Sequence, residues 1–178
     1  MTVQGKLIAR FTQNIPPGRL EWIGLRSGHR QPMVVVPEAL ALEGLGLQGD
    51  HRCDKTPGSA RQVTIISREF IAQTAQHLKG PQQDAFDQST LLPEQPSLNP
   101  ALLRRNLVVS GINLNALRYQ TIQIGEVLLE LTAICHPCSR METALGPGAV
   151  AAMLGYGGFC AKVLRGGVLK VGDWVEKS

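Results

Sequence analysis

The chain has 178 residues and a mass of 19.3 kDa, a length that fits one domain with a core of its own. Hydrophobic residues make up 43% of it and mean hydropathy is −0.01, which excludes global disorder, and no apolar run is long enough to span a bilayer. The net charge of +4 suits an anionic ligand, whereas aromatic residues amount to only 4%, too few for the stacking platforms of most single-strand nucleic-acid binders. We therefore expect one soluble domain over residues 1–178, with no nucleic-acid and no membrane partner.

The first residues lack the charged-then-apolar pattern of a secretory signal, so we expect a cytoplasmic protein. In a reducing compartment the four cysteines are expected to be thiols rather than disulfides.

Glycines and prolines divide the chain into short apolar runs, a pattern typical of strands joined by tight turns. Residues 62–66 are the first clear strand, followed by a helix with Ser67 as its N-cap and a stop at residues 80–81. Residues 81–100 are polar and rich in proline, and we interpret them as a surface excursion rather than a linker between domains. Asn99 then caps a short helix through about Arg105, and residues 107–109 form the next strand.

The C-terminal third contains two similar segments, residues 122–128 and 169–175, each made of a strand, a glycine with an acidic residue, and a second strand. Such a unit predicts a hairpin or a bulge, and two of them indicate a closed or nearly closed sheet. Residues 147–154 have helical character with Gly155 at the C-cap, and a βαβαβ alternation is not visible. The predicted fold is mainly β: a closed or nearly closed β-barrel with a few peripheral short helices.

The candidate chemistry centres on Cys135-His136-Pro137-Cys138, which holds two ionisable sulfurs with two residues between them. Thiolates are nucleophiles and ligands of soft metals, so the motif indicates sulfur transfer, redox exchange or metal ligation. A thioredoxin-like role fits poorly, because the segment after Cys138 allows barely two helical turns before Gly146-Pro147.

A structural zinc site would need ligands from elsewhere in the chain, and His51, Cys53 and Cys160 are the candidates. They lack a second Cys-x-x-Cys at finger spacing, so the zinc signal is weak.

Two polar clusters accompany the cysteines. Residues 103–107 place Arg104, Arg105 and Asn106 between a short helix and a strand, where guanidiniums could bind phosphate or carboxylate or simply favour the helix end. Residues 49–52 (Gly-Asp-His-Arg) lie on a predicted loop, and turn chemistry alone could explain the Gly-Asp pair.

Together these segments resemble the MOSC domain, the domain named for the C-terminal part of molybdenum cofactor sulfurases. The resemblance covers roughly residues 20–178 and keeps the order of five motifs, which are residues 49–50, 61–69, 103–111, 137–138 and 166–173. It implies a β-barrel of the type of the pyruvate-kinase barrel domain.

The resemblance also implies roles for individual residues. Cys138 corresponds to the reactive cysteine of the family, which would carry a persulfide sulfur or ligate molybdenum. Arg104 and Asn106 would contact the cofactor or its phosphate, and we place Asp50 and Arg140 at the same cofactor site. Many relatives read Gly-Asp-x-His, whereas His51 stands one place early here.

We expect a protein that binds the molybdenum cofactor, stably or transiently, or that carries sulfur on Cys138. One alternative is a molybdenum-dependent reductase of N-hydroxylated compounds that works with a partner reductase, and another is a non-catalytic zinc or interaction module. The partner would be an electron-transfer or sulfur-donor protein. Cys135 is either a resolving thiol for sulfur carried on Cys138 or a buried residue at a strand end, and Cys160 is expected in a strand core.

Overall fold

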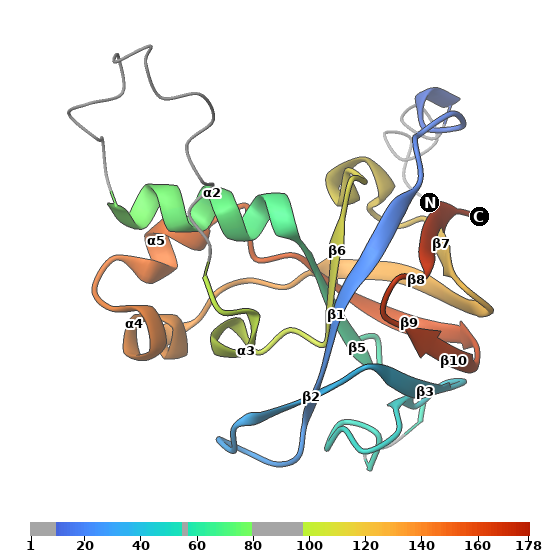
Figure 1. Cartoon of the computed structure of the whole chain (residues 1–178), viewed down its shortest axis with the longest axis horizontal. Coiled ribbons are helices and arrows are strands. Elements are labelled where there is room, and N and C mark those ends of the chain that lie inside the picture. Colours follow the sequence, from blue (N-terminus) through green and yellow to red (C-terminus); the bar gives the residue numbers. More distant parts are fainter. Residues whose placement is uncertain (1–9, 55–56, 80–97) are drawn as a thin grey trace.

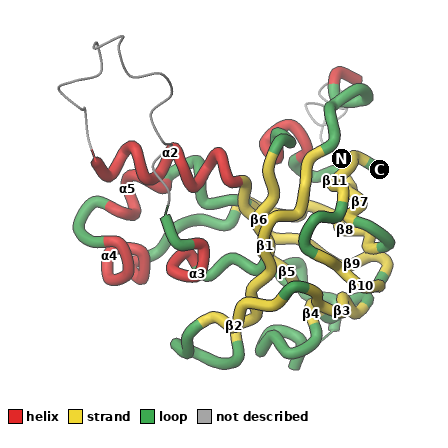
Figure 2. The backbone as a smooth tube through the Cα atoms, in the orientation of Figure 1, coloured by secondary structure: helices red, strands yellow, loops and turns green. Residues whose placement is uncertain are grey.

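Seven strands close into a barrel, in agreement with the predicted fold class (Figure 1, Figure 2). The computed structural model describes residues 10–54, 57–79 and 98–178. The strands of the barrel are β1 (Gly18–Arg26), β5 (Val63–Ser67), β6 (Leu107–Ser110), β7 (Thr121–Ile124), β8 (Val127–Ile134), β9 (Phe159–Arg165) and β11 (Trp174–Lys177). Around the ring they run in the order β11-β7-β8-β9-β5-β6-β1, and β1 pairs again with β11 through Gly18 opposite Val175 and Arg19 opposite Trp174.

Strands β5 and β6 are buried on both faces, which explains their continuous apolar sequences. In β5, Val63 and Ile65 lie in the barrel interior, whereas Ile66 belongs to a second apolar cluster outside the ring. In β6, Leu107 lies inside and Val108 outside in the same way. Thr64 is two residues from Ile66 in the same strand, so its side chain also points out of the barrel, where it lines a cavity that is described below.

Four short helices gather on one side of the barrel (Figure 2) and cover that outer apolar cluster. They are α2 (Arg68–Lys79), α3 (Pro100–Leu103), α4 (Ser139–Leu145) and α5 (Ala149–Met153), and a single 3-10 turn spans Leu114–Leu117. Ile71 of α2, Leu103 of α3, Met141 of α4 and Met153 of α5 meet there, each at most 3% exposed. Among the described residues, no helix is both long and apolar enough to cross a membrane.

The predicted caps of two helices are confirmed. The Ser67 hydroxyl accepts a hydrogen bond from the Phe70 amide at 3.1 Å at the start of α2. The Asn99 side chain accepts from the Ala101 amide at 3.0 Å, and α3 ends at Leu103, earlier than expected, because Arg104 has a left-handed backbone with φ of 54°. The predicted stop of α2 at residues 80–81 and almost all of the 81–100 excursion lie outside the described residues.

One pair of neighbouring strands is parallel, a feature that the sequence did not indicate. β5 and β6 pair in parallel, with Ile65 opposite Leu107, and α2 and α3 lie between them in the chain. A parallel pair requires a long crossover, which explains why helical sequence separates these two strands.

The sequence predicts a hairpin or a bulge in each of the two similar segments; the first forms a hairpin, and the second does not. Residues 122–128 form the antiparallel β7–β8 hairpin with Gly125 at φ of 55°. In residues 169–175, β10 (Gly167–Lys170) pairs with β3 (Glu38–Leu42), whereas β11 joins the barrel. The strands part because the connection bonds elsewhere: Val171 N donates to Pro37 O and Gly172 N to Leu20 O.

The remaining strands extend the two sheets. β3 also pairs with β4 (Gly46–Leu47), which completes a small three-stranded sheet, and β2 (Met33–Val36) pairs with β1 outside the ring.

Candidate functional site

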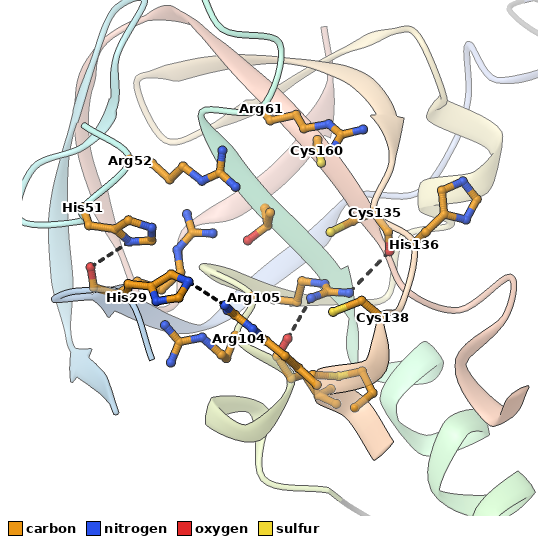
Figure 3. A pocket seen from close by; sticks show the side chains of 15 residues that line it. His29, His51, Arg52, Arg61, Arg104, Arg105, Cys135, His136, Cys138 and Cys160 are labelled. Atoms are coloured by element: carbon orange, nitrogen blue, oxygen red, sulfur yellow. Dashed lines mark hydrogen bonds between the residues drawn. The ribbon is translucent and has the colours of Figure 1, made fainter. Parts of the chain in front are cut away.

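A cavity of about 500 Å³ opens at one end of the barrel, between the β1–β2 hairpin tip (residues 27–32), the loop after β4, and the cysteine loop (residues 135–138) (Figure 3). We call it the arginine pocket. Its lining consists of Arg26, His29, His51, Arg52, Arg61, Thr64, Leu103, Arg104, Arg105, Cys135, His136, Cys138, Arg140, Met141 and Cys160. Six of these residues are arginines, three are histidines and three are cysteines, and no carboxylate from the described chain is among them. This composition favours an anionic ligand next to sulfur.

Cys138 presents an exposed thiol at this cavity. It is the N-cap residue of α4, with an extended backbone (φ −136°, ψ 175°), and its carbonyl accepts from Met141 N at 2.8 Å. The short α4 is held to α5 by the Glu142 carboxylate, which accepts from Gly148 N and Val150 N, both at 2.7 Å. The thiol is therefore carried on an anchored element and is open to solvent.

Arg105 supports the cysteine loop from behind. Its guanidinium donates to three backbone carbonyls: Gly157 O at 2.8 Å, Leu103 O at 2.7 Å and Cys135 O at 3.3 Å. Gly157 approaches this loop so closely that a Cβ there would lie 2.1 Å from Cys135 O. Arg105 is only 6% exposed, and none of the described carboxylates forms an ion pair with it. Its positive charge therefore remains available to the pocket.

A buried network fixes Arg26 at the pocket wall. The Asp50 carboxylate accepts from Arg26 Nε at 2.9 Å and from Arg26 Nη2 at 3.0 Å, and the two side chains are 1% and 9% exposed. Burial by itself would raise the pKa of the Asp50 carboxyl, but the hydrogen bonds and the charge of Arg26 outweigh burial, and the pKa lies below its ordinary value.

Asn106 completes this network and is fully buried. Its amide nitrogen donates to Asp50 Oδ2 at 2.7 Å and to Gly24 O at 3.0 Å. Its oxygen accepts from Arg26 Nη2 at 2.7 Å and from the Thr64 amide and hydroxyl at 3.1 and 2.9 Å. All of the hydrogen-bonding capacity of this amide is used within the protein.

Two arginines hold the hairpin tip over the pocket. Arg104 donates to the carbonyls of Gln31 and Gly28, the second at 3.3 Å. Arg140 Nη2 donates to His29 Nε2 at 2.8 Å. The positive charge of Arg140 is the main reason that the pKa of His29 lies below its ordinary value, which keeps that nitrogen free to accept the bond.

Cys135 and Cys160 form a second sulfur pair within the pocket. Ala133 lies opposite Cys160 in the β8–β9 ladder, so Cys135, two residues further on, shares the face of Cys160. A hydrogen bond from the Cys160 thiol and the charge of Arg105 outweigh burial and lower the pKa of Cys135 to about 6. The same bond raises the pKa of Cys160, so the pair favours a thiolate on Cys135 and a thiol on Cys160.

The structure brings three of the five predicted site residues to one cavity: Cys138, Arg104 and Arg140 line the arginine pocket. Asp50 and Asn106 lie behind its wall, where they bind Arg26. His51 also lines the pocket, with Nδ1 3.3 Å from Arg26 O. Cys160 is buried in β9 as expected.

Several lining residues were not singled out from the sequence. Arg26 and His29 do not belong to a recognisable sequence motif. The only signal for Arg26 would have been the need of a buried Asp50 for a positively charged partner. Arg61 and Arg52 lie in two of the motif segments but had no predicted role.

The fold and this pocket define a class: a small closed β-barrel that presents an accessible thiol within an arginine-lined cavity. The MOSC domain profile matches residues 50–176, and the chain belongs to the MOSC domain family, which is associated with the molybdenum cofactor. The earlier resemblance is thereby confirmed.

Solved structures show the same fold. The YuaD protein from Bacillus subtilis superposes with a TM-score of 0.69 and 19% identity, over 90% of this chain and 95% of that one. YiiM from Escherichia coli gives 0.61 and 19% identity over 90% and 69%, and YiiM from Geobacillus stearothermophilus gives 0.64 and 14% over 90% and 75%. No curated protein sequence matches the chain significantly.

Proposed function

We propose that this protein binds the molybdenum cofactor in the arginine pocket and carries sulfur as a persulfide on Cys138. The observation that carries the proposal is an exposed thiol in a cavity lined by six arginines, without a described carboxylate among the lining residues. Membership in the MOSC family supports the same conclusion.

The residues present fit the chemistry of that cofactor. Guanidiniums bind phosphate in a planar, bidentate manner, and Arg52 and Arg61 line the pocket with no ion pair among the described residues. Arg104 donates to two carbonyls of the hairpin tip. We therefore assign it two roles: it closes the pocket on that side, and its charge attracts the anion. When bound, the cofactor would supply a thiophilic metal and its sulfur ligands.

Asp50 and Asn106 act in this proposal through Arg26. Their side chains accept hydrogen bonds from the Arg26 guanidinium behind the pocket wall. These bonds fix the orientation in which the guanidinium faces the pocket. Both would then influence cofactor affinity without contacting the cofactor.

The zinc alternative requires several grouped ligands. Within residues 10–54, 57–79 and 98–178, no three His, Cys, Asp or Glu side chains are arranged to hold a metal ion.

The test compares wild-type protein, Cys138→Ser and Cys53→Ser, each purified from a host that makes the cofactor. Cys53 is a matched control, because it is a partly exposed thiol that does not line the pocket. We expect molybdenum in wild type and Cys53→Ser. After treatment with inorganic polysulfide both should also take up sulfur at Cys138, either retained as cyanolysable sulfur or released as hydrosulfide, and Cys138→Ser should show neither. If all three proteins lack both species, the proposal is wrong.

A further inference from the structure

The arginine pocket contains a second candidate nucleophile besides Cys138. Cys135, Cys138 and Cys160 all line it, and Figure 3 shows the Cys135 and Cys138 side chains entering the same cavity from the cysteine loop. A pair of cysteines with two residues between them is a spacing at which disulfides form in proteins. Three sulfurs at one cavity exceed what carrying a single sulfur atom requires.

The position of Cys135 is fixed more firmly than that of an ordinary loop residue. Its amide donates to Gly158 O at 2.8 Å, and its carbonyl accepts from the buried Arg105. The Arg105 guanidinium also brings positive charge next to this sulfur, which favours its thiolate form.

Cys160 supports the same assignment from the neighbouring strand. It is 3% exposed, so an external reagent reaches it poorly, whereas Cys135 is half-buried at the pocket surface. Interaction with the Cys160 thiol lowers the pKa of Cys135, which favours the thiolate on Cys135. Cys160 therefore acts on Cys135 as a positioning residue, and Cys135 is the more exposed of the two cysteines at the cavity.

We infer that Cys135 is the resolving thiol of the site and releases the sulfur carried on Cys138 as hydrosulfide. This inference rests on the proposed function, because it needs a persulfide on Cys138. The Cys135 thiolate attacks Cys138 Sγ, a sulfur–sulfur bond forms between the two cysteines, and the bond from Cys138 Sγ to the outer sulfur breaks. The outer sulfur leaves with the electron pair as HS⁻ and is reduced, while the two cysteine sulfurs are oxidised to a disulfide.

The step needs no additional oxidant, since the persulfide itself takes up the two electrons. A cellular dithiol would reduce the disulfide and return the site to its starting state. The product of the site would then be hydrosulfide, released within the pocket.

The experiment treats the reduced protein with inorganic polysulfide, removes the excess, and measures released hydrosulfide together with the mass of the peptide that holds both cysteines. In wild type we expect hydrosulfide release and a peptide that has lost two hydrogen atoms. In Cys135→Ser we expect no release and a peptide that keeps one additional sulfur on Cys138. Cys53→Ser should behave as wild type.

Other results separate the two proposals. If wild type and Cys135→Ser retain the sulfur on Cys138 equally, the resolving role is wrong and sulfur carriage stands. If the additional sulfur of wild type resides on Cys135 without a disulfide, the resolving role is also wrong. If neither protein takes up sulfur on Cys138, the proposed function itself fails. A wild-type peptide without the disulfide refutes the resolving role even where Cys135→Ser folds poorly.

Discussion

Asp50→Asn tests whether the buried network behind the pocket stabilises the protein. The variant keeps the shape of the side chain but removes the charge that faces Arg26 across 2.9 and 3.0 Å. Breaking a buried ion pair leaves an uncompensated charge and costs about 3–5 kcal/mol. A domain of this size is stable by only about 5–15 kcal/mol, so the change should be large in urea unfolding.

The control is Glu176→Gln, which removes an exposed carboxylate on β11 and should change the free energy of unfolding by less than about 0.5 kcal/mol. The double variant Arg26→Met with Asp50→Asn should recover part of the loss, because it no longer buries a lone charge. A loss below about 1 kcal/mol in Asp50→Asn would refute the reasoning, since it would mean that the pair contributes no more than an exposed one.

The same carboxylate predicts a pH dependence with a definite sign. Its folded pKa lies below the ordinary value of 3.8, so the unfolded state binds the proton more readily. The stability that Asp50 contributes is therefore complete above pH 3.8 and is lost as the pH falls through the folded pKa. In Asp50→Asn that part of the acid-induced loss should be missing.

Three further predictions concern the cysteine loop. Arg105→Met leaves three carbonyls without their donor, two of them in buried hydrogen bonds, and should cost about 3 kcal/mol in urea unfolding, whereas Arg118→Met at an exposed position should cost almost nothing. Gly157→Ala should cost about 1–3 kcal/mol and alter the alkylation rate of Cys138, because its Cβ would displace the Cys135 carbonyl; unchanged values for both would contradict the close approach. In a Cys138→Ser background, alkylation of Cys135 should be half-maximal near its pKa of about 6, and Cys160→Ala should move that midpoint upward. A midpoint that stays in place would exclude the hydrogen bond from Cys160.

The sequence predicted the parts of the fold that local patterns determine. Ser67 and Asn99 are helix caps because their side chains bond to amides two or three residues away, a relation that is visible in any sequence. The β7–β8 hairpin follows from a glycine at the turn between two apolar alternations. The partner of β10 could not be predicted in this way, since its choice of β3 depends on bonds from residues 171 and 172 to distant carbonyls.

The same distinction between local and long-range signals holds for the residues of the site. Cys138 was identified from its neighbours, because Pro137-Cys138 is a local motif, and the structure places it at the pocket. Arg26 was missed because its importance arises from Asp50 and Asn106, which are 24 and 80 positions away. Buried polar groups from distant parts of the chain form hydrogen bonds with one another in the folded barrel. Only the folded structure shows which of these groups faces the pocket.

The short pairing between β1 and β11 is where the ring is joined, and it consists of two opposed residue pairs. Arg19 reinforces it from outside, with its guanidinium 3.5 Å from the centre of the Trp174 ring and a 2.6 Å bond to Gly172 O. We expect local opening of the barrel to begin at this seam, and among its paired strands amide hydrogen exchange should be fastest there. None of its residues lines the arginine pocket, so we expect local opening at this seam to leave the pocket thiols in place.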